Sequence, residues 1–196
     1  MMDRIKKAFT FKQEVYKEVE DDVSFTTSAW IIVAVVAFLN QLGSKASLVH
    51  VTGGGSWLGG TIGGTVFAVG GFALGAFVIS WAGKTFFNAE VTFDELVRTL
   101  GLAYVWNIIG FLGIIGAISP ALGCITAPIA FIAGIAGLVA WFIAAKEALD
   151  LEWPQTIGTV IIGWVASLVV SLIAGAILGL FGLAGAGVGA ALRGLR

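Results

Sequence analysis

Charged residues are scarce in this sequence. Only 12% of its 196 residues are charged and 58% are hydrophobic, whereas about a quarter of a soluble domain is charged. Such a chain cannot cover a folded surface with polar groups, so we expect its solvent to be lipid. Its net charge of −1 gives no reason to expect a nucleic-acid partner.

Cysteine and histidine are nearly absent. One cysteine, Cys124, excludes an internal disulfide and any metal site with several thiolates. It lies in an apolar stretch, so we expect a small buried hydrophobe there. The single histidine, His50, falls in a predicted loop and cannot alone supply the three or four ligands of a usual metal site.

The usual signatures of catalysis and nucleotide binding are missing too. The long apolar runs contain no Asp, Glu, Lys, Arg or His, which leaves no intramembrane Ser–His pair, HExxH motif or paired aspartates. Gly83-Lys84-Thr85 resembles the end of a phosphate-binding loop, but Val78 stands where that motif needs glycine. We therefore predict no catalytic residue, no cofactor and no metal site, and hence no enzyme.

Long apolar runs are what the sequence has instead. At about 1.5 Å per residue, even the shortest reaches ~27 Å as a helix, close to a hydrocarbon core of roughly 30 Å. Strands of a membrane barrel would alternate in polarity over ~10 residues, which these runs do not. We predict an all-α, polytopic integral membrane protein with five transmembrane helices, at about 25–42, 57–82, 99–118, 121–145 and 157–181.

The joints between these runs are also visible. Ser119-Pro120 leaves almost no loop and predicts a tight helical hairpin, and Pro128 predicts a kink in the fourth span. Thr92-Phe93-Asp94-Glu95 has the pattern of a capping box, which predicts a helix start before the third span. Trp153-Pro154 marks the entry to the fifth span.

Both ends of the chain differ from the middle. Residues 1–24 hold nearly half of the charges, with apolar residues at helical spacing between them, for example Ile5, Phe9, Tyr16 and Val19. We interpret this segment as an amphipathic helix on the inner membrane surface; the alternative is a helix docked on the cytoplasmic loops. The Gly-rich tail, 182–196, is too short to cross and either extends span five or lies at the interface.

The distribution of lysine and arginine predicts the orientation. With the N-terminus inside, eight fall on the inner side and three, Lys45, Arg193 and Arg196, on the outer side. This excess favours a cell (inner or plasma) membrane protein with a cytoplasmic N-terminus and an outside C-terminus.

Small and polar residues within the spans predict close helix packing. Glycines three or four residues apart let helix backbones approach, and we expect such contacts at Gly71, Gly75, Gly110, Gly113, Gly175 and Gly179. Packing within the chain is favoured over self-association. For Asn40 and Asn107 we expect helix-to-helix hydrogen bonds.

Three short stretches resemble the bacterial branch of the YIP-domain (Ypt/Rab-interacting protein) family. They are the charged stretch from Phe11 to Asp22 before the first span, the step Gly83-Lys84-Thr85-Phe86-Phe87, and Thr92-Phe93-Asp94-Glu95-Leu96 followed by Arg98 and Gly101-Leu102-Ala103. The resemblance runs from about residue 5 to residue 180. It implies a multi-pass protein, and eukaryotic relatives bind prenylated small GTPases and act in membrane traffic.

The resemblance gives little support to GTPase binding here. Those relatives continue with an aromatic Gly-Tyr-Ile-Tyr-Gly stretch after Gly-Lys, whereas Asn88-Ala89-Glu90 follows Phe87 in this chain. The expected partners are the bilayer and other membrane-protein subunits or a second copy.

We hypothesise a non-enzymatic protein that organises membrane or partner proteins through its charged cytoplasmic face. The alternatives are an accessory subunit of a larger membrane complex and a passive channel or small-solute carrier. The candidate partner-binding residues are Glu18, Glu20, Asp21, Asp22, Gly83 and Lys84.

Overall fold

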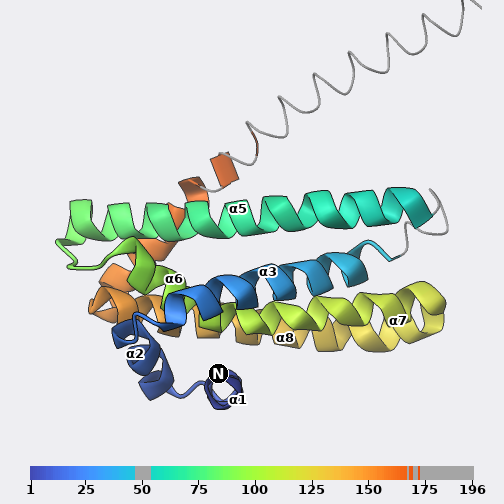
Figure 1. Ribbon diagram of the computed structural model, residues 1–196, viewed down its shortest axis with the longest axis horizontal. Helices are drawn as coiled ribbons and strands as arrows, with labels where there is room; N and C mark the ends of the chain where they lie inside the picture. The colour runs from blue at the N-terminus through green and yellow to red at the C-terminus, as the bar shows by residue number, and fades with distance from the viewer. Residues whose placement is uncertain (47–53, 167, 170–171, 173–196) are drawn as a thin grey trace, which may run out of the picture.

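The computed structural model describes residues 1–46, 54–166, 168–169 and 172, and every regular element in this part is a helix (Figure 1). The prediction of an all-α fold is therefore confirmed for the described chain. The elements are α1 (Met2–Ala8), α2 (Gln13–Asp21), α3 (Phe25–Ser44), α5 (Gly54–Phe87), α6 (Phe93–Ala103), the 3₁₀ helix η1 (Tyr104–Leu112), α7 (Gly113–Ile118) and α8 (Pro120–Leu149). Residues 153–166 form a further helix.

Four segments are long and apolar enough to cross a membrane: Phe25–Ser44, Trp57–Phe87, Phe93–Ile118 and Ala121–Leu149. They match the first four predicted spans. The predicted fifth span, 157–181, is helical through residue 166, and most of the rest lies outside the described residues. So do Gly175, Gly179 and the tail 182–196.

The long helices expose large apolar side chains on their outer faces. Phe131 is 70% exposed and Val66 68%, and helices that are apolar all round belong in lipid. The chain is therefore a multi-pass membrane protein. Cys124 was expected to be buried but lies exposed on α8, because lipid, unlike water, does not force apolar groups inward.

Two helices extend well beyond their predicted spans. α5 continues to Phe87 and α8 to Leu149, so they measure about 51 and 45 Å, against about 30 Å for α3. The extra turns contain the charged residues Lys84 and Lys146. Each helix ends just before a residue in the left-handed conformation: Asn88 (φ 53°) follows α5, and Asp150 (φ 49°) follows α8. Hydropathy marked the lipid core rather than the helix ends.

The third span is divided into three elements. Thr92 begins α6 with the predicted capping box: the Glu95 N–H donates to Thr92 Oγ1 at 3.2 Å, and the Thr92 N–H donates to Glu95 Oε2 at 2.7 Å. From Tyr104 the chain tightens into η1 and then relaxes into α7. A 3₁₀ segment of nine residues is longer than usual, and nothing in the sequence predicted it.

The 3₁₀ segment lies where the third span contacts α3. A Cβ at Gly43 would overlap the Gly110 carbonyl oxygen, and one at Gly113 would lie 2.5 Å from the Gly43 carbonyl oxygen. The two backbones touch, which only glycine allows. Asn40 Nδ2 donates to the Asn107 carbonyl at 2.7 Å beside this contact, so the hydrogen bond expected from Asn40 is present.

The predicted hairpin between spans three and four is confirmed. α7 ends at Ile118, Ser119 is extended (φ −149°, ψ 127°), and Pro120 is the first residue of α8. A Cβ at Gly116 would lie 3.3 Å from the Gly123 Cα, so the two helices run in close contact. α8 continues through Pro128 as one helix.

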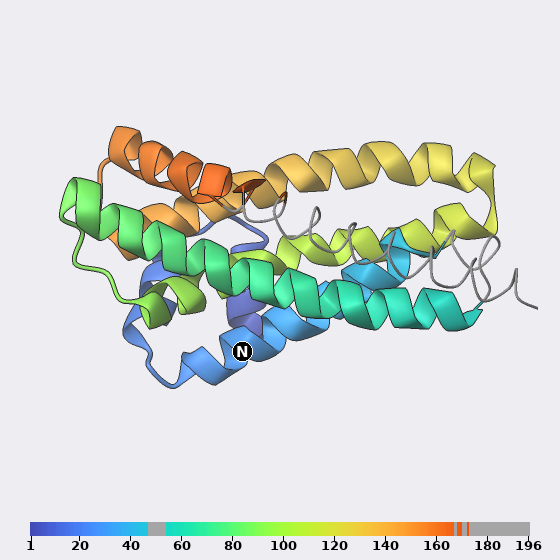
Figure 2. The ribbon, with the colours of Figure 1, turned by 90° about the horizontal axis from the view of Figure 1, so that it is seen from above.

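An aromatic cluster fills the centre of the bundle. The Phe72 ring of α5 lies edge-on to Trp30, Tyr104 and Trp141 at centroid distances of 5.7, 5.5 and 5.9 Å. Figure 2 shows residues 153–166 beside α5 and α8, where Trp164 meets Phe142 at 5.6 Å.

Candidate functional site: the charged end of the bundle

One end of the bundle carries nearly all the charge. We call the charged end α1, α2, α6, the last turns of α5 and α8, and the turn 150–152, most of which lies at the left of Figure 1. Among the charged residues that the structure describes, Lys45 alone lies at the opposite end, where its Nζ donates to the Gly60 carbonyl at 2.5 Å. The charged end is the place to look for recognition chemistry.

The N-terminal segment forms two helices joined by an aromatic elbow. Phe11 adopts a left-handed conformation (φ 55°), which is unfavourable for a bulky side chain. Its ring stacks on Trp106 of η1 at 5.2 Å, and Phe9 meets the same indole edge-on at 5.0 Å. The elbow is thereby held against the third span.

The apolar face of α2 is buried within the protein. Val15, Tyr16 and Val19 are at most 1% exposed, and α2 packs on α6 and α8. The structure thus docks α2 on the protein, which is closer to the alternative arrangement, although the contacts are with the helices α6 and α8 rather than with loops. Hydrophobic periodicity alone could not distinguish protein from lipid as the covering surface.

Arg98 fixes the end of α2. This side chain is only 4% exposed. Its Nε donates to the carbonyls of Val19 and Glu20 at 3.1 and 3.0 Å, and its Nη2 also donates to the Glu20 carbonyl. The last carbonyls of a helix carry partial negative charge and lack intrahelical donors, so a buried guanidinium there satisfies both the charge and the hydrogen bonds.

Arg98 also reaches the start of α3. Its Nη1 donates to Thr26 Oγ1 at 3.3 Å. One side chain of α6 thus joins α2 to the first spanning helix. From the sequence, Arg98 entered only the charge count for the orientation and the family resemblance. The signal that could have identified its role is a lone arginine just before an apolar span.

Ion pairs join the predicted interface residues to α1 and α8. Arg4 of α1 lies 2.9 Å from Glu18 and 2.6 Å from Asp22, and Lys17 lies 3.1 Å from Glu20 and 3.3 Å from Asp150.

The pKa values of these carboxyl groups are shifted in opposite directions, downward by hydrogen bonds and upward by burial. Hydrogen bonds from the Ser24 hydroxyl, which has the larger effect, and from Arg4 lower the pKa of Asp22. The hydrogen bond from Arg4 also lowers the pKa of Glu18. Burial raises the pKa of Glu20. The contacts of Asp22 and Glu18 therefore favour their anions, whereas burial works against the anion of Glu20 and outweighs its ion pair with Lys17.

The six candidate interface residues do not form one surface. Asp21 and Lys84 are exposed, whereas Glu20 is buried and Gly83 is packed inside. A Cβ on Gly83 would lie 2.8 Å from Leu149 Cδ2. Gly83 also accepts a hydrogen bond from the Ala89 N–H at 3.0 Å, where α5 turns toward α6.

The packing glycines also occupy different environments. Gly110 and Gly113 lie against α3, whereas a Cβ on Gly71 would meet no described atom within 4 Å. Gly75 is partly buried in α5. Gly43, which is not among the predicted packing glycines, lies directly against the Gly110 carbonyl.

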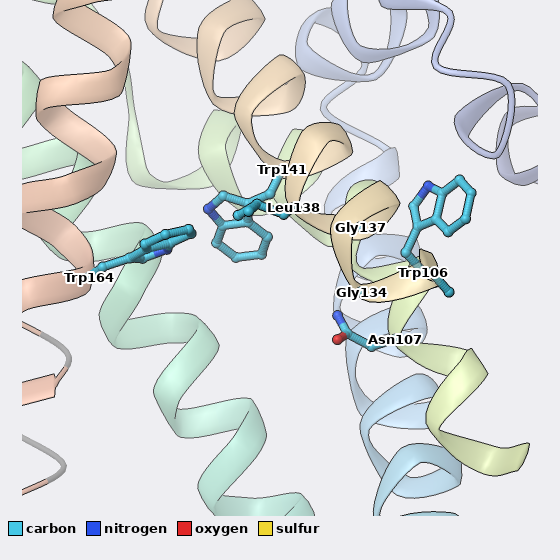
Figure 3. Close-up of a pocket in the computed structure, with 8 residues that line it drawn as sticks. Trp106, Asn107, Gly134, Gly137, Leu138, Trp141 and Trp164 are labelled. Atoms are coloured by element: carbon cyan, nitrogen blue, oxygen red, sulfur yellow. The ribbon is translucent and has the colours of Figure 1, made fainter. Parts of the chain in front are cut away.

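A cavity of about 240 Å³ lies between η1, α8 and the last described helix (Figure 3). Trp106, Asn107, Gly137, Trp141 and Trp164 are among its lining residues, and no titratable side chain is among them. The indole Nε1 atoms of Trp106 and Trp141 are buried without a hydrogen-bond partner in the described structure. Such a cavity can accept an apolar group but offers no acid or base.

The described residues contain no group of three His, Cys, Asp or Glu side chains placed to hold a metal ion. The chemistry available at the charged end is therefore that of salt bridges, hydrogen bonds and surface recognition.

Comparison with known protein families gives one match. The model of the Yip1 domain matches residues 6–175. Searches of curated proteins and of solved structures found no match.

Proposed function

The chain belongs to the Yip1 domain family of membrane proteins, and on this premise we propose that it binds partner proteins through its charged end, as a non-enzymatic protein that organises them at the membrane. The family is not known for enzymatic activity. The observation that carries the proposal is the docking of α2: Arg98 and the buried apolar face hold it in one position.

Docking leaves the outer side of the charged end available. Lys12, Glu14 and Asp21 are exposed around α2, and Lys84 and Asp94 are exposed on neighbouring elements. A surface already ordered before binding loses less conformational entropy when a partner arrives. Charges of both signs favour a partner surface that is itself charged in both signs.

The charge asymmetry supports a cytoplasmic position for this end. Eight lysines and arginines belong to it in the predicted topology, and cytoplasmic segments carry such an excess. We infer a cell-membrane protein with its N-terminus in the cytoplasm and, with a fifth crossing, its C-terminus outside.

The channel alternative receives no specific support. Asn40 Nδ2 donates to the Asn107 carbonyl, and Asn107 Nδ2 donates to the Tyr104 carbonyl at 3.2 Å. The Asn40 amide thus joins α3 to η1, whereas the Asn107 amide bonds within η1 rather than to another helix as expected.

Site-specific photo-crosslinking in cells tests the proposal. A photoreactive residue at Glu14 or Asp21 should give discrete adducts with another protein, and one at exposed Ser44, at the opposite end, should not. A photoreactive residue in place of Lys84 should also form an adduct if all three positions face one partner. The double charge reversal Glu14→Lys with Asp21→Lys should then remove this adduct. Identical adducts from Ser44 and Glu14, or adducts insensitive to charge reversal, would contradict it.

A further inference from the structure

Glu20 is a buried acid in the last turn of α2. Only 8% of the residue is exposed, although the next residue, Asp21, is an exposed acid. A carboxylate is seldom buried to this extent unless it is both paired with a cation and hydrogen-bonded. The groups around Glu20 therefore decide how well its charged form is tolerated while α2 is docked.

The Glu20 carboxyl group is incompletely paired. Its Oε2 atom is buried and makes no hydrogen bond within the described structure. The Lys17 ammonium lies 3.1 Å from this atom, but the Lys17 side chain is 45% exposed and also donates to both carboxylate oxygens of Asp150 at 3.3 Å. A cation that is half in solvent and shared between two acids compensates poorly for the burial of one of them.

The other charges nearest to Glu20 do not supply a second counter-ion. Arg98 of α6 approaches the same residue, but its hydrogen bonds go to the main-chain carbonyls of Val19 and Glu20. Asp21 and Asp150 are like charges, and both act to raise the pKa of Glu20.

The remaining charged side chains of the helices packed on α2 are engaged elsewhere or exposed. The engaged ones are Arg4 of α1 with Glu18 and Asp22, Glu95 of α6 with the Thr92 N–H, and Lys146 with Glu147 of α8. The exposed ones are Asp3, Lys6 and Lys7 of α1 and Asp94 of α6.

Tyr16 adds a second unpaired polar atom to the docked face of α2. Side chains four residues apart lie on the same side of a helix, so Tyr16 and Glu20 share a side. The Tyr16 hydroxyl is buried without a hydrogen-bond partner in the described part of the chain, and burial raises its pKa. A neutral hydroxyl among apolar side chains suits a neutral carboxylic acid better than a carboxylate.

Docking of α2 and protonation of Glu20 are therefore linked. Burial outweighs the effect of Lys17 and raises the pKa of Glu20 in the docked helix, whereas an undocked α2 returns the carboxyl group to water and to its ordinary pKa. The docked state binds the proton more tightly, so docking strengthens as the pH falls and weakens as the pH rises through the raised pKa.

Glu18 and Asp22 act in the opposite sense. Their pKa values are lowered in the folded protein, so their contacts with Arg4 weaken only below about pH 4, the ordinary range of a carboxyl group. The two effects thus occupy different pH ranges and can be measured separately.

We propose that Glu20 is a proton-sensitive latch: with a proton taken up from water the neutral acid holds α2 against α6 and α8, and as a carboxylate it loosens the helix. Protonation leaves Lys17 to Asp150 alone, so the link between α2 and the end of α8 is kept. The latch acts on the docking of α2 itself and does not require a protein partner.

Hydrogen exchange of the full-length protein in neutral detergent, followed by mass spectrometry, tests the latch. Exchange rates corrected for the intrinsic rate at each pH report how often a helix opens, even when the open state is rare. Peptides from α2 should be better protected at about pH 5.5 than at about pH 7.5, by at most about tenfold per pH unit, since one proton is involved. Peptides from the middle of α8 are the internal reference and should not follow this change.

Two single substitutions separate Glu20 from its neighbour. Glu20→Gln keeps the shape of the neutral acid and cannot ionise, so its α2 should be equally protected at both pH values, at the level that the wild type reaches in acid. Asp21→Asn removes the adjacent exposed carboxylate and should keep the pH dependence of the wild type.

Several results would overturn the latch. They are wild-type protection of α2 that does not change with pH, protection that falls between pH 7.5 and pH 5.5, a pH dependence that persists in Glu20→Gln, and equal effects of the two substitutions. Infrared spectroscopy gives a readout independent of opening: the band of a protonated carboxyl group that titrates above the ordinary range should be absent in Glu20→Gln. None of these outcomes would affect the partner adducts expected from Glu14 and Asp21.

Discussion

Arg98 brings a full positive charge into the interior and meets main-chain carbonyls there rather than a carboxylate. The planar guanidinium has several donors in a fixed geometry, so a single arginine can serve two carbonyls and a hydroxyl together. Lysine, with one ammonium, could not reach them all. At the scale of single residues, this side chain determines where the N-terminal segment lies.

Replacing Arg98 should therefore release α2. In Arg98→Gln the Val19 and Glu20 carbonyls lose their donors, and we expect a loss of about 2–3 kcal/mol in unfolding free energy, the usual cost of removing a charged hydrogen-bonding group. Trypsin should then cut at Lys12 and Lys17 much faster than in the wild type. Thr26→Val, which removes only the acceptor at 3.3 Å, is the matched control and should cost less than about 1 kcal/mol. Unchanged cleavage in Arg98→Gln would show that the buried face of α2 suffices.

Between elements, the contact of α3 with η1 is set by glycine. Gly43 lies against the backbone of Gly110 and Phe111, and η1 is the segment where the third span departs from α-helical geometry. Asn40 adds a hydrogen bond within the same contact. At Gly43 the backbones of α3 and the third span therefore meet directly, with the Asn40 side chain packed beside them.

A matched pair of alanine substitutions tests this crossing. Gly43→Ala should destabilise the protein by about 1–3 kcal/mol, because the new methyl group must displace backbone. Gly71→Ala adds a methyl group at a position with no described atom within 4 Å and should be neutral or stabilising by up to about 1 kcal/mol. Thermal unfolding in detergent would measure both. Equal effects at the two positions would argue against a backbone contact at Gly43.

The sequence predicted those elements whose signals are local. The capping box at Thr92 and the hairpin at Ser119-Pro120 depend on neighbouring residues, and both are found where they were expected. The docking of α2 and the 3₁₀ form of η1 depend on contacts with residues far away in sequence, such as Arg98 and Gly43. Likewise, Asp21 and Glu20 are adjacent acids, yet only the fold makes one exposed and the other buried.

The whole molecule is polar along its long axis, with α2, α6 and the overhanging ends of α5 and α8 at one end. α5 and α8 are about 15–20 Å longer than α3, and they support the charged end beyond the start of the first span. The proposed partner binding and the predicted orientation both concern this single end.

Cysteine labelling of intact and permeabilised cells tests the orientation. In a Cys124→Ser background, Glu14→Cys should react with a membrane-impermeant maleimide only after permeabilisation. Ser44→Cys, at the opposite end, should react in intact cells, because an odd number of crossings separates the two positions. The reverse pattern would place the charged end outside and remove the basis for a cytoplasmic partner.

The docking of α2 has a consequence for synthesis on the ribosome. α2 contacts Arg98 across 79 residues and Asp150 across 133. At roughly 5–20 residues per second, the first of these partners is made about 4–16 seconds after α2, and the second about 7–27 seconds after it. During that interval the apolar face of α2 has no protein surface to cover it, so the nascent segment must rest on the bilayer or be shielded by a chaperone until α6 and α8 are in place.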